Sequence, residues 1–498
     1  MGNPYLDAFM AEAGSTGLTF DDVSLVTQYA DFMPAETDVT TRFSRRITLN
    51  TPFVSAAMDT VTESCLAIAI AKLGGIGVIH KNLSPQEQAD EVATVKHYLN
   101  GLIASPVVFY SDMTVADVLA AKAARKYTFS GFPILDRVDR LVGILTARDM
   151  KFLTDYNVPV ESVMTRNPIV VEPGTSMTEA FQIMMERKVG KLPIVDTSRR
   201  LLGLFSFNDL RSLIDNMEPE FNRDAQHRLR VAAAIGPNDE ARIEALVRAD
   251  VDALVVDTAH GHTKSVIETV KMLKQRYPAV DVVAGNVGTA EGAADLVRAG
   301  ADAVKVGIGP GSICTTRVVA GVGIPQLSAV YQAAKAVAGD VPIIADGGVS
   351  YSGDAAKAVA VGASCVMMGS ALAGTEECPG ERILHQGRTY VVYRGMGSLD
   401  AMKAGRGSRE RYSQGDVENH ENLVPQGIEG MIPYRGPLAA VLHQFIGGLR
   451  FALGYCGARS IPELQAKAKM VRVTAAGRHE AHPHDVTVIK DAPNYRAT

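Results

Sequence analysis

The stretches VRADVDALVVD (residues 247–257), VRAGADAVKVG (297–307) and VAVGASCVMMG (359–369) are three copies of one pattern. In each copy the end of an amphipathic helix runs into a short turn of small residues and then into an apolar run. A continuous apolar run, as opposed to an alternating one, is typical of a strand buried on both faces of a parallel sheet. The repeat therefore predicts β–α units that share one buried sheet.

Further apolar runs of this kind occur along the chain, and helical patterns separate nearly all of them. They are PFVSAAM (52–58), GIGVIH (75–80), VAAAI (231–235), VVAGN (282–286) and PIIADGG (342–348). Together with the three copies they make eight units, the number that a closed (β/α)8 barrel requires. We therefore predict an α/β chain built on a TIM barrel. An open, doubly wound sheet is the alternative, and eight regular units make it less favoured.

A second repeat interrupts the barrel after its second unit. GFPILDRVDRLVGILTARDM (131–150) aligns with KLPIVDTSRRLLGLFSFNDL (191–210), sixty positions later. Each copy predicts a strand, a polar turn, a second strand and a helix that begins at Thr146 or Ser206. Because barrel loops tolerate insertions, we expect this pair to form an independent module.

The length of 498 residues and the insertion predict more than one domain. We expect the barrel over residues 1–100 and 217–498, and the inserted pair over 101–216. The chain is 47% hydrophobic and 21% charged, which favours well-packed cores. Its formal net charge of −5 gives no reason to expect a nucleic acid as the main partner.

Signals for export or membrane insertion are not found in the sequence. The beginning, MGNPYLDAFMAEAG, lacks the basic and apolar regions of a secretory signal. The apolar stretch 65–79 is interrupted by Lys72 and a glycine pair, and it is too short to span a bilayer. The five cysteines include no C-x-x-C pair, so neither a zinc site nor a disulfide framework is indicated. We expect a cytoplasmic protein in a reducing compartment.

The loops after the carboxyl ends of barrel strands are where such enzymes place their chemistry. Polar residues and glycines follow the predicted strands at Ser55, Asp257, Thr258, Asn286, Asp346, Gly348, Gly369 and Ser370. Glycines in the last two loops would let backbone N–H groups approach an anion, and Ser370 or Ser312 would add a hydroxyl donor. We expect a phosphate there. Tight turns without a ligand are the alternative.

The loop GIGPGSICTTRVVAGVG (307–323) follows the sixth predicted strand and carries Cys314. Cys65 and Cys365 lie within apolar helix or strand patterns and are expected to be inert core residues. Cys314 instead lies in a polar, glycine-rich loop, where a thiolate can be presented to a substrate. Position alone leaves open whether Cys314 is a nucleophile or the loop is only a flexible connection, because no histidine close in sequence is an evident base.

A long polar segment, residues 394–436, lies near the end of the predicted barrel. It has few apolar residues, many glycines and charges, and no clear periodicity. A disordered insertion is one interpretation. A long polar loop at the catalytic end of a barrel favours the other, a mobile flap over the site.

Several motifs, in this order, resemble those of the inosine-5′-monophosphate (IMP) dehydrogenase family. They are SAAMDTVTE (55–63), DTAHGH (257–262), GPGSICTTR (309–317), DGGV (346–349), MMGSALAGTEE (367–377), YRGMGS (393–398) and ERY (410–412). The inserted pair resembles that family's tandem CBS (Bateman) module. The resemblance implies NAD-dependent oxidation of IMP to xanthosine monophosphate (XMP), in guanine nucleotide synthesis. The Cys314 thiolate would attack carbon 2 of the purine, hydride would leave for NAD+, and the covalent thioimidate would be hydrolysed after the flap closes.

The resemblance also implies a role for each matching residue. Arg411 would be the base that activates water, with Tyr412 and Thr316 beside it, although a guanidinium normally stays protonated. The substrate contacts would be Ser55, Ser312, Asp346, Gly348, Gly369, Ser370, Tyr393, Met396, Gly397 and Gln426. The NAD contacts would be Asp257, Thr258 and Asn286. Many family members carry glutamate where this chain has Gln426. Because glutamine cannot accept a proton, the alternative relay through the threonine is put in doubt and Arg411 gains weight.

A potassium (K+) site and oligomeric assembly rest on the same resemblance. Carbonyls of Gly309, Gly311 and Cys314 would bind K+ together with Glu480, Ala481 and His482 of a neighbouring subunit. A homotetramer is implied, with an octamer formed through the CBS modules as the larger arrangement. Asp149 and Asp209 would contact the ribose of adenine or guanine nucleotides bound to the CBS pair.

Two other functions remain open at this point. Guanosine monophosphate (GMP) reductase shares the barrel and the cysteine loop, but it typically lacks the inserted pair and the Arg-Tyr flap. A catalytically inactive, nucleotide-sensing CBS protein is the second alternative. The presence of Cys314, Thr316, Arg411 and Tyr412 together argues against it.

Overall fold

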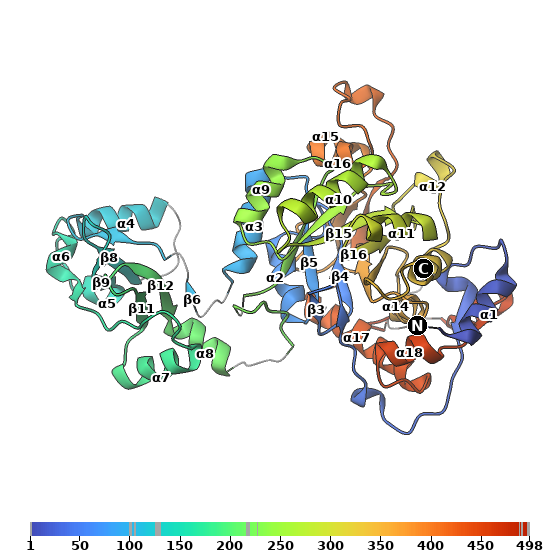
Figure 1. The fold of residues 1–498 in the computed structure, drawn as a ribbon, viewed down its shortest axis with the longest axis horizontal. Helices are drawn as coiled ribbons and strands as arrows, with labels where there is room; N and C mark the ends of the chain where they lie inside the picture. Colours follow the sequence, from blue (N-terminus) through green and yellow to red (C-terminus); the bar gives the residue numbers. More distant parts are fainter. Residues whose placement is uncertain are drawn as a thin grey trace. The chain divides into compact units, whose positions relative to one another are not determined.

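The computed structural model describes residues 2–98, 102–103, 106–124, 131–215, 220–226, 228–487, 489 and 492–495. The chain divides into two compact units, Met1–Lys96 with Glu220–Thr498, and His97–Pro219 (Figure 1). The expected domain boundaries at residues 100–101 and 216–217 lie outside the described residues. None of the helices in the described part of the chain combines the length and apolar character needed to span a bilayer.

Eight parallel strands close into a barrel in the first unit. Their order around the barrel is β13 (Val231–Ile235), β14 (Ala253–Asp257), β15 (Asp281–Val287), β16 (Ala303–Val306), β17 (Ile343–Asp346), β18 (Cys365–Met368), β4 (Phe53–Ser55) and β5 (Ile76–Ile79). Each of the eight apolar runs in the sequence forms one of these strands, so the predicted (β/α)8 barrel is confirmed. Ser55 and Asn286, expected after their strands, belong to the ends of β4 and β15.

Helices follow the strands and cover the outside of the barrel (Figure 1). They are α2 (Ser64–Lys72), α3 (Pro85–Lys96), α9 (Glu240–Arg248), α10 (Lys264–Arg276), α11 (Ala290–Arg298), α13 (Gln326–Val337) and α14 (Ser352–Ala360). Several begin at a side-chain cap: Asp239, Thr263 and Thr289 each accept a hydrogen bond from an amide in the first turn. Such caps satisfy backbone donors that have no partner inside the helix.

The barrel interior is filled by small and branched apolar side chains. Val54, Val78, Ala234, Val255 and Ile344 belong to this fully buried cluster. Side chains alternate along a strand, so every second residue points into the barrel. At the carboxyl ends of three strands, the next inward position after the apolar layers carries a charge, at Asp257, Lys305 and Asp346.

The two cysteines expected in the core differ from one another. Cys365 is fully buried in the barrel interior, and burial raises the pKa of its thiol. Cys65 is exposed, so the expectation of a core position is wrong for this residue. Helix α2 buries a stripe that contains Leu66 and Ile70, and Cys65 lies off that stripe.

The second unit contains two small sheets built from the two sequence copies. Their orders are β10 (Thr165–Arg166), β9 (Leu141–Thr146), β8 (Gly131–Leu135), β7 (Phe109–Tyr110), and β11 (Lys191–Val195), β12 (Leu201–Ser206), β6 (Leu102–Ile103). The copies share their register: Ile134 pairs with Gly143, and Ile194 pairs with Gly203. Helices α5 (Ala147–Met150) and α8 (Phe207–Asp215) follow, which confirms the predicted strand–turn–strand–helix order.

The polar segment 394–436, which we call the flap, is ordered around two short helices. It follows β20 (Arg388–Arg394) and includes α15 (Leu399–Ala404), α16 (Arg406–Arg411) and β21 (Glu429–Pro433), which pairs with β20. Figure 1 shows α15 and α16 next to each other beside the barrel helices. The sequence displayed no periodicity here because six-residue helices are too short for an apolar pattern to repeat.

Candidate active site

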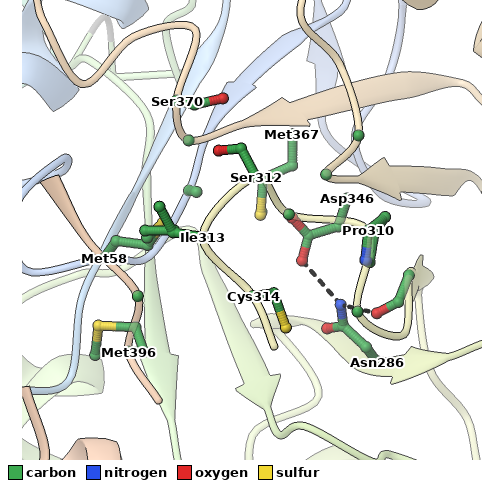
Figure 2. Close-up of a pocket in the computed structure, with 18 of the residues that line it drawn as sticks. Met58, Asn286, Pro310, Ser312, Ile313, Cys314, Asp346, Met367, Ser370 and Met396 are labelled. Atoms are coloured by element: carbon green, nitrogen blue, oxygen red, sulfur yellow. Dashed lines mark hydrogen bonds between the residues drawn. The ribbon is translucent and has the colours of Figure 1, made fainter. Parts of the chain in front are cut away.

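A cavity of about 250 Å³ opens at the carboxyl ends of the barrel strands (Figure 2). Loops from several strands and from the flap line it. The sequence candidates in the lining are Asp257, Asn286, Gly309, Gly311, Ser312, Cys314, Thr316, Asp346, Gly348, Gly369, Ser370, Tyr393, Met396, Arg411, Tyr412 and Gln426. The whole lining runs from Ala56 to Gln426, so residues more than three hundred positions apart in sequence meet at one site.

Other candidates lie outside this lining. Ser55 is fully buried, and its hydroxyl accepts a hydrogen bond from Thr62 Oγ1 at 2.9 Å. The Thr258 hydroxyl donates to the carbonyl of Gly285 at 2.8 Å, and Gly397 lies against the ring of Tyr412. These residues support the walls of the cavity.

The C-terminal candidates also lie away from the cavity of their own chain. Glu480 and Ala481 end helix α19 (Ala475–Ala481), and His482 follows it. The ring Nδ1 of His482 is 3.1 Å from the hydroxyl of Tyr495. Neither Glu480, Ala481 nor His482 belongs to the cavity lining.

The thiol of Cys314 has polar neighbours from its own loop and from the flap. Its sulfur lies 3.2 Å from Thr316 Oγ1 and 3.6 Å from the carbonyl oxygen of Gln426. The Thr316 hydroxyl in turn donates to Gln426 Oε1 at 3.0 Å. Cys314 also forms a backbone bridge with Gly427. The flap therefore packs directly onto the cysteine loop, with one hydroxyl between the thiol and an amide.

A group of hydroxyls and glycines lies on another side of the cavity. Figure 2 shows Ser312 close to Ser370, whereas Cys314 lies toward Asn286. Burial raises the pKa of the Tyr393 hydroxyl, and hydrogen bonds with Ser312 and Ser370 oppose that rise. Such a set of donors suits an anion such as phosphate.

Two glycines in this region are required by geometry. Gly348 has a φ of +78°, a backbone conformation that favours glycine. At Gly369 a Cβ atom would lie 2.9 Å from the hydroxyl oxygen of Tyr393. A larger residue at either position would displace the backbone or the tyrosine, so these glycines keep the backbone close to the hydroxyl group.

The charged layer at the top of the barrel is centred on Lys305, a residue that the sequence analysis missed. Its ammonium lies 2.8 Å from Asp257 Oδ1 and 2.7 Å from Asp346 Oδ2, and it also donates to Asn286. The Asn286 amide donates to Asp346 Oδ2 at 2.9 Å. Buried lysines are rare unless they are paired. A lysine inside the apolar run AVKV was the signal that could have revealed it.

Arg411 and Tyr412 are carried to the cavity by the end of α16. The Arg411 guanidinium forms an ion pair with Asp257 Oδ2, and the Arg411 carbonyl accepts a hydrogen bond from Ala259 N at 2.9 Å. Burial raises the pKa of the Tyr412 hydroxyl, and the charge of Arg411 opposes that rise. Asp257 is thus bound by a barrel lysine and a flap arginine at once.

Lys81 is a second buried lysine that the sequence analysis missed. It follows β5, in a loop that was not considered, and its ammonium donates to the backbone carbonyl of Asp257 at 2.9 Å. Burial lowers the pKa of Lys81 to about 7, and the charge of Arg411 acts in the same direction. The amine therefore changes its charge near neutral pH. It lies against the backbone of Asp257, the residue whose carboxylate pairs with Arg411.

The two aspartates expected to contact a nucleotide ribose in the second unit occupy equivalent helix starts. Asp149 lies in the first turn of α5, and its carboxylate accepts hydrogen bonds from the amide and the hydroxyl of Thr146, both at 2.7 Å. Asp209 lies in the first turn of α8. Asp149 therefore acts as a capping residue in this structure.

Fold and cavity together define a (β/α)8-barrel protein with a cysteine loop under a polar flap at the carboxyl ends of its strands. The family model described as IMP dehydrogenase / GMP reductase domain matches residues 17–484. The chain belongs to this family, as the sequence motifs predicted. It is 54% identical to an inosine-5′-monophosphate dehydrogenase of Aquifex aeolicus, over 96% of this chain and 97% of that protein. It is 46% identical to the inosine-5′-monophosphate dehydrogenase of Bacillus subtilis, over 96% of this chain and 98% of that protein.

A similar solved structure is a cysteine-to-alanine variant of GMP reductase from Trypanosoma brucei in complex with guanosine 5′-monophosphate. Its TM-score is 0.84 at 37% sequence identity, and the match covers 96% of this chain and 100% of that chain. The uncovered remainder is too small to contain the second unit, His97–Pro219. An insertion is therefore compatible with GMP reductase. The sequence analysis counted the inserted pair as an argument against GMP reductase, and this argument does not hold.

Proposed function

We propose that this chain is an IMP dehydrogenase, which oxidises IMP to XMP with NAD+ through a covalent adduct on Cys314. The family relationship and the names of the full-length relatives support this function. The observation that carries it is the presence of Cys314, Arg411 and Tyr412 in the lining of one cavity. A covalent intermediate that is later hydrolysed needs a nucleophile and a water-activating group at the same carbon.

In this proposal the phosphate of the nucleotide lies at the hydroxyl and glycine side of the cavity. Ser312, Ser370 and Tyr393 supply hydroxyl donors there, and backbone amides at Gly348 and Gly369 add N–H groups. Asp346 would accept hydrogen bonds from the ribose hydroxyls. Met396, which lines the cavity, and Gln426 from the flap then bound the purine beside Cys314.

The first chemical step forms the bond between the Cys314 sulfur and carbon 2 of the purine. Hydride leaves the same carbon, and NAD+ supplies the acceptor for it when bound. Asp257, Thr258 and Asn286 are the proposed contacts for the dinucleotide. Because the Asp257 carboxylate is paired with Arg411 in this structure, the docked flap and the dinucleotide would compete for this side chain.

The second step adds water to carbon 2 and breaks the carbon–sulfur bond, which restores the thiol. Arg411, as its neutral guanidine, would take the proton of the attacking water and become the guanidinium that the Asp257 carboxylate binds. The Thr316 hydroxyl donates to Gln426, a side chain that cannot take a proton onward. A relay through Thr316 therefore ends at Gln426, which leaves Arg411 as the base.

We also propose a monovalent cation at the cysteine loop. Carbonyls of Gly309, Gly311 and Cys314 would hold K+, because a hard cation prefers oxygen ligands. The Gly311 carbonyl accepts the Cys314 amide at 3.1 Å, and its second lone pair is left for a cation. Ligands from Glu480, Ala481 and His482 of a neighbouring subunit would complete the site, which requires an oligomer such as a tetramer.

The second unit is proposed to bind adenine or guanine nucleotides as a CBS pair, with Asp149 and Asp209 at the ribose. It would also carry the contacts that join two tetramers into an octamer. Calorimetric titration of ATP and GTP into the full chain and into the Asp209→Ala variant tests the nucleotide part. Heat that disappears in the variant would support it, and equal heat in both proteins would contradict the role of Asp209.

Mass spectrometry of the protein after mixing with IMP and NAD+ tests the main proposal. We expect NADH formation and a purine nucleotide adduct on Cys314, and neither in the Cys314→Ala variant. GMP reductase activity would instead consume NADPH with GMP and release ammonia. Formation of IMP from GMP with no NADH from IMP would overturn the proposal. Absence of both reactions would favour a nucleotide-sensing protein without catalysis.

A further inference from the structure

One side chain of the barrel, Asn82, contacts both helices of the flap. Asn82 lies in the loop after β5, three residues beyond Ile79, the last residue of the strand. Its Oδ1 accepts a hydrogen bond from Ser408 N at 3.0 Å, and its Nδ2 donates to the carbonyl of Ala401 at 3.0 Å. Ser408 belongs to α16 and Ala401 to α15, so one amide group joins the two helices to the barrel.

One of these contacts replaces a cap that helix α16 does not supply itself. Helix α16 begins after Gly405, which has no side chain to cap it. The amide of Ser408, the third residue of the helix, is the donor that a capping side chain normally satisfies. The carbonyl of Ala401 in α15 already accepts a hydrogen bond from Gly405 N at 3.2 Å, and Asn82 Nδ2 gives it a second one. Asn82 therefore caps the start of α16 from outside the flap and binds α15 through a second hydrogen bond to a carbonyl.

The backbone of the flap approaches this loop as closely as glycine allows. A Cβ atom at Gly405 would lie 2.1 Å from Asn82 Oδ1, and one at Gly407 would lie 2.2 Å from the carbonyl oxygen of Lys81. Gly405 has a φ of −152°, which any residue can adopt. Its lack of a side chain is thus needed for the approach to Asn82 and not for backbone conformation.

A carboxylate links Asn82 to the root of the flap. Asp59 accepts a hydrogen bond from Asn82 Nδ2 at 2.8 Å and is bound by Arg394, with Nε at 3.1 Å and Nη2 at 2.8 Å. Arg394 ends β20, where the flap begins. Asn82 and Asp59 together therefore hold the flap at its first residue and at both of its helices.

We propose that Asn82 is a positioning residue for the hydrolytic step, an inference that rests on the proposed function. Ser408 and Arg411 are three residues apart, so they lie within one turn of α16. Fixing the amide of Ser408 fixes the orientation of that turn, and with it the approach of Arg411 to Asp257. Asn82 does not line the cavity, so it acts through the flap and not on the substrate.

The two chemical steps respond differently to this contact. Formation of the Cys314 adduct and hydride transfer use the cysteine loop, the barrel loops and the flap residues Met396 and Gln426, which lie outside helices α15 and α16. Hydrolysis requires Arg411 at the cavity. Loss of the Asn82 amide is therefore expected to slow the second step selectively.

Rapid mixing of the Asn82→Ala variant with IMP and NAD+ tests this selectivity. We expect a burst of NADH at nearly the wild-type rate, followed by a steady-state rate lower by roughly tenfold, since the cap of α16 and one hydrogen bond to α15 are lost. The adduct on Cys314 should accumulate in the same samples. Gln86→Ala is the matched control, because the Gln86 amide bonds Asp90 within α3 and is expected to leave both phases unchanged.

The Gly405→Ala variant tests the contact from the flap side. The three atoms nearest to its added Cβ all belong to the Asn82 amide, so Gly405→Ala alone is expected to give the same burst and slow hydrolysis. In the Asn82→Ala background that amide is gone, and the second substitution should add less than about twofold. Independent, multiplying effects of the two substitutions would contradict the proposed contact.

The outcomes separate this inference from the proposed function. A wild-type protein that forms no NADH and no adduct would contradict the function itself. If the wild-type protein is active but both variants lose burst and steady-state rate equally, the positioning role alone is overturned. Unchanged kinetics in both variants would overturn it as well. Should Asn82→Ala fail to fold, Gly405→Ala gives the same readout, because the φ of −152° at Gly405 is allowed for alanine.

Discussion

The guanidinium of Arg411, at the end of flap helix α16, is paired with the carboxylate of Asp257, at the end of barrel strand β14. The same carboxylate binds the buried ammonium of Lys305 at 2.8 Å. One aspartate therefore joins a fixed cation of the barrel and a cation that the flap carries. With the flap docked, the Arg411 side chain is part of the cavity lining.

Replacement of Arg411 by alanine should slow hydrolysis far more than hydride transfer. A positioned general base contributes about 10²–10⁴-fold to the rate of its step. We expect the NADH burst of Arg411→Ala to be nearly normal and the steady-state rate to fall at least about 100-fold. Rapid-mixing absorbance and mass spectrometry of the adduct measure the two steps.

Arg406→Ala provides the control for that experiment. Arg406 lies in the same helix but is 69% exposed, and it pairs with Glu410 on the surface. Its removal should leave both rates near wild type. A normal steady-state rate in Arg411→Ala would end the assignment of Arg411 as the base.

The change Gln426→Glu should restore part of the activity lost in Arg411→Ala. Thr316 Oγ1 donates to Gln426 Oε1 at 3.0 Å, so a carboxylate at this position would receive the same hydrogen bond and accept a proton. We expect the double variant to hydrolyse the adduct roughly tenfold faster than Arg411→Ala, at the low end of the contribution of a general base. Equal adduct lifetimes in the two proteins would show that Thr316 and residue 426 form no relay.

Hydrolysis should weaken as the pH falls through about 7, where Lys81 gains its proton. An exposed lysine is already protonated below about pH 10, but burial and then the charge of Arg411 lower the pKa of Lys81, against the opposing charges of Glu410 and Asp239. Protonated Lys81 would repel Arg411, so the flap should dock less well at low pH. Adduct decay measured from about pH 6 to about pH 8 should show this acid limb in the wild type. The Lys81→Met variant should lose it, and an unchanged profile would contradict the role of Lys81.

Loss of the Lys305 ammonium should destabilise the barrel strongly. Lys305→Met leaves the carboxylates of Asp257 and Asp346 without their buried cation, and breaking such a buried pair costs about 3–5 kcal/mol. Urea unfolding monitored by circular dichroism measures the change. Lys335→Met is the control: this lysine is 50% exposed and pairs with Asp7, so its removal should cost about 1 kcal/mol or less. Equal midpoints for the two variants would contradict a structural role for Lys305.

The barrel strands were predictable because a strand buried on both faces needs a continuous apolar run, and each of the eight runs carries that signal locally. The repeat in the second unit was predictable for a similar reason, since Gly143 and Gly203 occupy the same place in two copies of one pattern. The flap helices were not predicted, because six residues give no repeating pattern. Cys65 was placed wrongly because an apolar neighbourhood in sequence does not say which side of a helix faces the core.

The sequence by itself determined the order of the β–α units and the place of the insertion. It also identified the candidate catalytic residues, including Cys314 and the Arg411–Tyr412 pair. Only the tertiary structure decided which of them meet. The charged contacts among Asp257, Lys305 and Arg411, and the capping of the flap by Asn82, join segments far apart in the chain. Local propensity and periodicity carry no information about such pairs, because their free energy arises from burial together in a folded barrel.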